Sequence, residues 1–100
     1  MQKSVEAFIQ KHRLSCGVQN RYIDLTSELG ELGKEILKNS AYGKSAYQSA
    51  EQAEEELGDC LFSLLALACE MSIDAEDALK HALSKYERRF SQKGEISSGK

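Results

Sequence analysis

The sequence predicts an all-α fold, on three observations. The 100 residues include no proline and only seven glycines, whereas turn-rich β proteins use more of both. Glu, Lys, Ala, Leu and Ser are abundant, and apolar residues recur at helical spacing in four segments. With 41% hydrophobic and 29% charged residues, the chain has enough apolar material to fold. We expect a four-helix bundle-like single domain over residues 1–93, completed by oligomerisation, and a flexible tail at 94–100.

Two helices are predicted in the first forty residues. The first begins after Ser4, a suitable N-cap, and ends near Leu14. The second is expected from about Asn20 to Asn39, because an apolar stripe recurs there at helical spacing. The stripe consists of Leu25, Leu29, Leu32 and Ile36.

The third predicted helix starts between Tyr47 and Ser49 and ends near Met71. From Cys60 to Cys69 it is apolar on nearly every side, so its second half is expected to be buried. Four helices in a 100-residue chain supply too few neighbours for this. The sequence therefore predicts a homodimer or a homotetramer.

The fourth predicted helix begins after Asp74, the expected N-cap, and frays after Lys93. Its apolar residues are expected to face inward; they are Leu79, Ala82, Leu83, Tyr86 and Phe90.

Charge and apolar runs exclude several classes of protein. A net charge of −3 argues against binding to nucleic acid. The apolar run of Cys60 to Cys69 is too short to cross a membrane, and the N-terminus lacks the apolar core of a signal peptide. Three widely spaced cysteines suggest neither a disulfide framework nor a zinc knuckle. We therefore expect a cytoplasmic protein without a membrane partner.

Acidic residues are concentrated on the second and third helices. Glu28, Glu31 and Glu35 stack on one face beside the apolar stripe, at i, i+3 and i+7. Glu56 and Asp59 repeat this spacing on the third helix, with Glu55 alongside. Stacked like charges repel, so stability alone does not select this pattern.

Carboxylates carried into a low-dielectric bundle without partners would protonate or destabilise the fold unless a cation compensates them. Mg²⁺ is the obvious one, because it prefers oxygen ligands and binds through carboxylates and substrate phosphates. No Glu-x-x-His pair is present, which argues against a di-iron bundle site. The alternative is that these acids are solvated helix faces. Likewise, Lys85, Arg88 and Arg89 on the fourth helix either form a solvated stripe or hold a metal-bound phosphate.

These segments resemble the MazG-like nucleotide pyrophosphohydrolases. SELGEL at residues 27–32 and EELGDCLF at 55–62 are similar to the family pattern EExxE, a variable spacer and ExxD, and KYERRF at 85–90 is similar to the C-terminal helix. The match covers roughly residues 20 to 92. The resemblance implies an all-α fold that is dimeric or a dimer of dimers. It implies hydrolysis of a nucleoside triphosphate to the monophosphate and pyrophosphate.

The resemblance also implies site residues. The Mg²⁺ ligands would be Glu28, Glu31, Glu56 and Asp59, with Mn²⁺ as an alternative ion, and the phosphate contacts would be Lys85 and Arg89. A spare carboxylate, Glu35 or Glu55, would be the general base or lie behind the ligands. A base-stacking aromatic stays open among Phe8, Tyr22 and Tyr47.

Two residues depart from the family pattern. Ser27 stands where the leading glutamate of EExxE is usual, and Leu83 stands where many relatives carry an asparagine near the substrate. The first departure keeps open a non-catalytic helical oligomerisation or binding module. The second keeps open a same-fold enzyme specific for dUTP, dCTP or phosphoribosyl-ATP.

Overall fold

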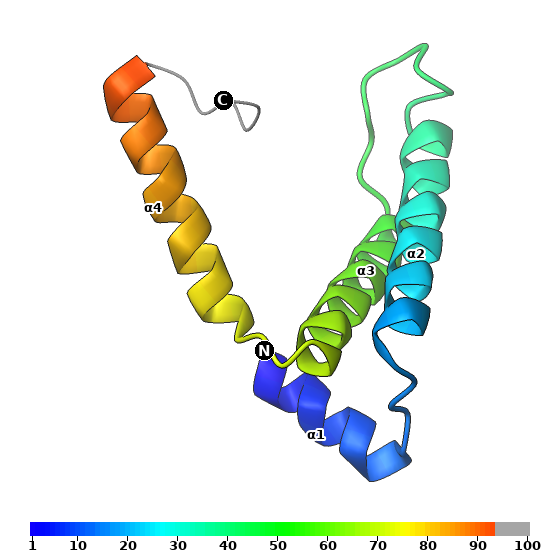
Figure 1. Ribbon diagram of the computed structural model, residues 1–100. Coiled ribbons are helices and arrows are strands. Elements are labelled where there is room, and N and C mark those ends of the chain that lie inside the picture. The colour runs from blue at the N-terminus through cyan, green and yellow to red at the C-terminus, as the bar shows by residue number, and fades with distance from the viewer. Residues whose placement is uncertain (94–100) are drawn as a thin grey trace.

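The computed structural model of the chain describes residues 1–93, which form four helices and no strand. The helices are α1 (Gln2–His12), α2 (Val18–Lys38), α3 (Glu51–Glu70) and α4 (Ala75–Lys93). The all-α prediction is confirmed. Figure 1 shows α2 and α3 as an antiparallel hairpin, with α1 across the end where α3 finishes and α4 running away from the hairpin. The predicted tail at 94–100 lies outside the described residues.

The core of the chain is the contact between α3 and its neighbours α2 and α1. On α3 the buried residues recur at helical spacing, as Ala53, Cys60, Ser63, Leu65 and Ala66. Ile9 of α1 is also buried, and the rings of Phe8 and Phe62 meet edge to face with centroids 6.0 Å apart. The core is small for four helices, since α4 contributes no buried residue among those described.

The first helix begins earlier than predicted. It starts at Gln2, so Ser4 lies within it and does not cap it. The Gln2 side chain donates to the carbonyl of Ile73 (2.8 Å) and accepts from the amide of Ala75 (2.7 Å). These hydrogen bonds fix the start of α1 to the connection between α3 and α4. The helix ends at His12, and its C-cap residue Arg13 has a left-handed φ of 54°.

The remaining boundaries differ from the predictions by a few residues. Helix α2 begins after Gly17, whose φ of 93° suits glycine. The long loop before α3 extends further than predicted, and α3 starts only after Ala50. The predicted N-cap of α4 is confirmed, because the Asp74 carboxylate accepts from the amide of Asp77 at 3.0 Å.

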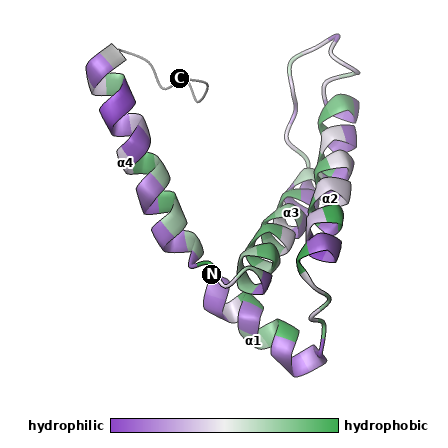
Figure 2. Cartoon of the chain, viewed as in Figure 1, coloured by the Kyte–Doolittle hydropathy of each residue, from purple (hydrophilic) through white to green (hydrophobic). Residues whose placement is uncertain are grey.

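The prediction that α4 faces inward is wrong within one chain. Leu79, Leu83 and Phe90 are 54%, 58% and 58% exposed, and α4 does not pack along the hairpin. Figure 2 shows the hydrophobic residues of α4 lying apart from those of α2 and α3. The expected burial of the second half of α3 is only partial, since Leu64 is 50% exposed. The four helices therefore do not close into a bundle within one chain, and oligomerisation stays a prediction. None of the described helices is long and apolar enough to cross a membrane.

Candidate metal centre

Three carboxylates from α2 and α3 converge at the middle of the hairpin. One oxygen each of Glu28, Glu56 and Asp59 can be chosen so that all three lie within 4.8 Å of one another. Glu28 and Glu56 are half-buried and Asp59 is exposed. The centre is thus open to solvent on one side and bounded by the helices on the other.

Helix geometry explains this convergence. Glu56 and Asp59 lie one turn apart on α3, and Glu28 faces them from α2. On α2, Leu25 and Leu32 lie one turn before and one turn after Glu28, and both are half-buried. These half-buried leucines therefore place Glu28 at the contact between the helices.

Burial and electrostatic repulsion both oppose ionisation at the centre. Burial raises the pKa of Glu28, and the negative charges of Asp59, Glu56, Glu31 and Asp24 raise it further. The pKa of the buried Cys60 thiol is raised by burial and then by the charges of Glu28, Glu56 and Asp59. Each ionised carboxylate thus opposes ionisation of its neighbours. A cation among them would relieve this repulsion.

The donor set fits a hard divalent cation. All three groups supply carboxylate oxygens, the ligands that Mg²⁺ and Mn²⁺ prefer. Ligands at 2.1 Å from one ion lie at most about 4.2 Å apart, so small side-chain rotations would bring these oxygens onto a common ion. Within the described residues, none of the three carboxylates is engaged in an ion pair. Among residues 1–93, the Gln52 amide donates a hydrogen bond to Glu56, at 3.3 Å.

The other predicted acidic residues lie outside the group of three. Glu31 is exposed but close enough for its charge to raise the pKa of Glu28. Glu35 is half-buried and paired with Lys38, whose ammonium lies 3.1 Å from its carboxylate. Glu55 is exposed on α3. The structure therefore brings together three of the four predicted ligands and leaves Glu31 at their edge.

The structure does not bring the predicted phosphate contacts to the carboxylates within one chain. Lys85 and Arg89 are on α4, which diverges from the hairpin (Figure 1). Both residues are half-buried, and the Lys85 ammonium lies 4.8 Å from the centroid of the Tyr86 ring.

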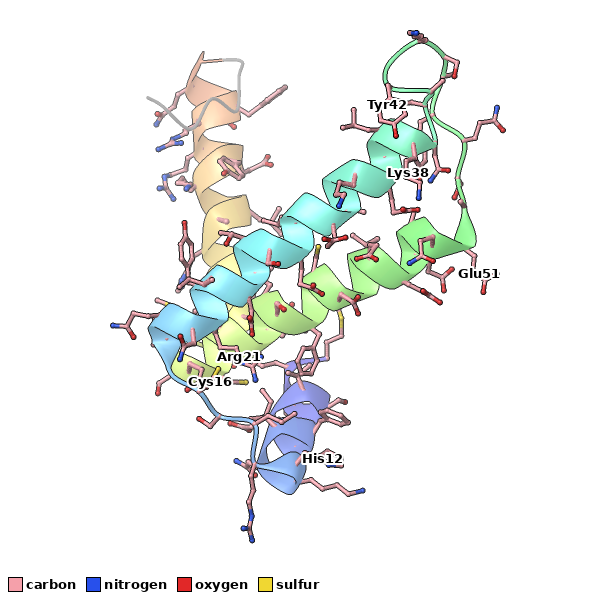
Figure 3. The ribbon with its side chains drawn as sticks, turned by 90° about the vertical axis from the view of Figure 1, so that its right-hand side faces the viewer. His12, Cys16, Arg21, Lys38, Tyr42 and Glu51 are labelled. Carbon is pink, nitrogen blue, oxygen red and sulfur yellow. The ribbon has the colours of Figure 1, made fainter. Side chains whose placement is uncertain are left out.

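Sequence reasoning missed a second polar contact, at the end of the hairpin. Arg21 is only 7% exposed; its guanidinium donates to the carbonyl of Leu14 (2.7 Å) and lies over the Phe62 ring, 5.8 Å from the centroid. Figure 3 shows Arg21 and Cys16 at the start of α2. Helical spacing could have identified Arg21 as a buried residue. It lies four residues before Leu25 and seven before Glu28, on the face of α2 that contacts α3.

The fold and the site define an all-α protein with a carboxylate centre suited to a divalent metal. The model of the MazG nucleotide pyrophosphohydrolase domain matches residues 19–92, so the chain belongs to this family, whose members generally use a divalent metal ion. The chain is similar to uncharacterized protein YpjD of Bacillus subtilis (strain 168), with 41% identity over 68 residues. These residues are 65% of this chain and 60% of YpjD, so the match spans less than two thirds of that relative. No solved structure matches the chain significantly.

Proposed function

We propose that the chain is a Mg²⁺-dependent nucleoside triphosphate pyrophosphohydrolase, which releases a nucleoside monophosphate and pyrophosphate. The observation that carries this proposal is the convergence of Glu28, Glu56 and Asp59 within 4.8 Å, in a chain of the MazG family. Repulsion among these groups is a standing cost to the fold, which a bound cation would offset. Mn²⁺ has the same preference for oxygen ligands and is the alternative ion.

Each acidic or basic residue of the site is given a role that follows from its place in the chain. Glu28, Glu56 and Asp59 would hold the ion, and Glu31 would add a fourth carboxylate from the same side of α2. When bound, the ion neutralises phosphate oxygens and makes the α phosphorus more open to attack by water. We assign proton acceptance from this water to Glu35, one turn after Glu31 on α2, or to Glu55, which precedes Glu56 on α3. Lys85 and Arg89 would bind the phosphates of the substrate.

We also propose a cytoplasmic homodimer or homotetramer. The three cysteines of the chain are free thiols, which is the state that the reducing cytoplasm would maintain. The exposed apolar residues of α2, α3 and α4 support an oligomer.

A second function is favoured by one residue. Ser27 replaces the leading glutamate of the family pattern, and it is exposed on α2 next to Glu28. Loss of that carboxylate would suit a non-catalytic binding module of the same fold. Such a module would bind metal weakly and would release no pyrophosphate.

Pyrophosphate release from a panel of canonical, deoxy and oxidised nucleoside triphosphates separates these functions. The panel includes dUTP and dCTP, and phosphoribosyl-ATP is assayed beside it, so that a restricted substrate choice is visible. Turnover is expected with Mg²⁺, and Glu56→Gln with Asp59→Asn should reduce it by more than about 100-fold, since even the partners behind metal ligands are worth about 10–100-fold. Glu51→Gln, which neutralises an exposed acid at the start of α3, is the matched control and should retain activity. Silence of the folded wild-type protein with both Mg²⁺ and Mn²⁺ would reject the enzyme.

A further inference from the structure

A cavity of about 370 Å³ lies where α1 crosses the end of α3 (Figure 1). It is lined by Glu6, Ile9, Gln10 and Arg13 of α1, and by Cys69 and Glu70 of α3. Its volume falls within the usual range of small-molecule sites, about 300–1,000 Å³. No carboxylate of the metal centre lines this cavity, so it would be a second, separate site.

The wall that α1 contributes carries opposite charges at its two ends. Its four residues follow the spacing i, i+3, i+4 and i+7, which places them on one side of the helix. Glu6 and Arg13 are the outermost two, about 10 Å apart along the helix axis. Ile9, which is buried, and Gln10 lie between them. A ligand along this wall would therefore contact an acid, an apolar stretch and a base in turn.

The opposite wall supplies a fixed carboxylate, that of Glu70. Its Oε2 atom accepts from the backbone amides of Cys16 (2.9 Å) and Gly17 (3.2 Å), and both oxygens accept from the Ser15 hydroxyl. These hydrogen bonds lower the pKa of Glu70, so the group is charged at neutral pH. Within residues 1–93, Oε1 accepts from Ser15 alone, at 3.2 Å. This oxygen can therefore accept another hydrogen bond, from an ammonium group of a ligand.

Arg13 is the one basic residue that lines the cavity, and its backbone is in a left-handed conformation (φ 54°, ψ 50°). Glycine is the usual residue at this position after a helix, because a side chain is strained there. Backbone geometry therefore favours glycine over arginine, and does not explain why a guanidinium lines the cavity. Among the described residues, neither Arg13 nor Glu6 forms an ion pair. Both charges are therefore available to a ligand.

We propose that this cavity binds a free α-amino acid with a basic side chain. Arginine binds a carboxylate through two parallel hydrogen bonds, so Arg13 would hold the α-carboxylate. The α-ammonium group would donate to Oε1 of Glu70. The two acids and one base give the cavity a net charge of −1, which a ligand of charge +1 neutralises. A second amine, on a flexible four-carbon stem such as that of lysine, would lie along Ile9 and reach Glu6.

Calorimetric titration of the protein with three ligands tests this proposal. The ligands are L-lysine, L-norleucine, which lacks the side-chain amine, and cadaverine, which lacks the carboxylate. Lysine should bind, and each of the others should bind about 10-fold or more weakly, because each loses a hydrogen bond between charged groups. The absence of lysine binding at about 10 mM, or cadaverine binding as tight as that of lysine, would overturn the proposal. The titration uses no nucleotide, so its outcome does not depend on the proposed function.

Arg13→Gly separates the effect on binding from an effect on folding. Glycine suits the left-handed backbone, so the Tm should be unchanged or raised, whereas the affinity for lysine should fall about 10-fold or more. Lys11→Gln removes an exposed charge from the other side of α1; it is the matched control and should keep the affinity. Glu6→Gln should weaken lysine binding to that of norleucine and leave norleucine binding unchanged. An affinity for lysine that survives Arg13→Gly or Glu6→Gln would refute the assigned contacts and with them the proposal.

Discussion

The carboxylate of Glu70, the last residue of α3, accepts a hydrogen bond from the backbone amide of Gly17, the residue that precedes α2 (3.2 Å). It also accepts from the amide of Cys16 at 2.9 Å and from the hydroxyl of Ser15. The negative charge therefore lies at the positive end of the α2 dipole, where amides lack partners within the helix. This contact joins the two ends of the hairpin, and so supports the register that brings Glu28 opposite Glu56.

We predict that Glu70→Gln destabilises the fold in a pH-dependent way. The amides of Cys16 and Gly17 and the hydroxyl of Ser15 lower the pKa of Glu70 below its ordinary value of 4.5. The ionised Glu70 carboxylate therefore stabilises the fold at pH values above 4.5, and this stabilisation is lost as the pH falls through the lowered pKa. Thermal unfolding should show a lower Tm for the variant at neutral pH and a shrinking difference below about pH 4.

Glu87→Gln is the control for this experiment, because Glu87 is an exposed acid of α4. It should change the Tm little at either pH. An equal deficit of Glu70→Gln at neutral and at acid pH would show that its effect is steric, and would contradict the role of the charge.

We predict that the metal-free protein is stabilised by neutralising its own site. Because the pKa of Glu28 is raised, the folded state holds this proton more tightly than the unfolded state. The ionised Glu28 carboxylate therefore destabilises the fold at pH values above the raised pKa, and this destabilisation disappears as the pH falls through it. In EDTA, Glu56→Gln with Asp59→Asn should unfold at a higher temperature than wild type, most clearly near pH 8.

With Mg²⁺ present, wild type should instead unfold at a higher temperature than the double variant. At 100 times its Kd, a ligand of the folded state alone raises the free energy of unfolding by about 2.7 kcal/mol, and the double variant should lose this gain. Unfolding followed by circular dichroism with and without Mg²⁺ measures both effects. A wild-type Tm that does not respond to Mg²⁺ or Mn²⁺ would argue against a metal centre at these carboxylates.

Local patterns were sufficient to predict the four helices. Spacing placed six acids beside the apolar stripe, and only the resemblance to the family narrowed them to Glu28, Glu31, Glu56 and Asp59, of which the structure brings Glu28, Glu56 and Asp59 together. The start of α1 could not be predicted from spacing, because Gln2 is held by hydrogen bonds to Ile73 and Ala75, residues more than seventy positions away. Contacts at such separation leave no periodic signal in the sequence.

The placement of α4 is another result that spacing could not give. The apolar positions Leu79, Leu83 and Phe90 correctly mark one face of a helix, but they do not say which chain that face contacts. The prediction had this face pointing inward in a bundle completed by oligomerisation. The anchored connection to α3 turns α4 elsewhere, so the same pattern leaves an exposed stripe.

We predict that the three cysteines react with iodoacetamide at very different rates. Cys16 is exposed, whereas Cys60 is buried between the hairpin helices and has a raised pKa, which lowers its thiolate fraction. Mass spectrometry of the native protein should show modification at Cys16 first and at Cys60 last, and denaturation should remove the difference. Early labelling of Cys60 would show that α2 and α3 separate readily, which would contradict a rigid metal centre.

We predict that Arg21→Met lowers the free energy of unfolding by about 1–3 kcal/mol, the usual cost of losing a hydrogen bond from a charged donor. The substitution keeps an apolar stem against Phe62, but it removes the bond to the Leu14 carbonyl. Asp24→Asn is the matched control: Asp24 is Arg21's ion-pair partner at 3.5 Å, with a side chain 57% exposed, and such pairs contribute about 0–1 kcal/mol. Urea unfolding of both variants separates the two contributions. A larger loss for Asp24→Asn than for Arg21→Met would place the stabilisation in the ion pair and not in the buried hydrogen bond.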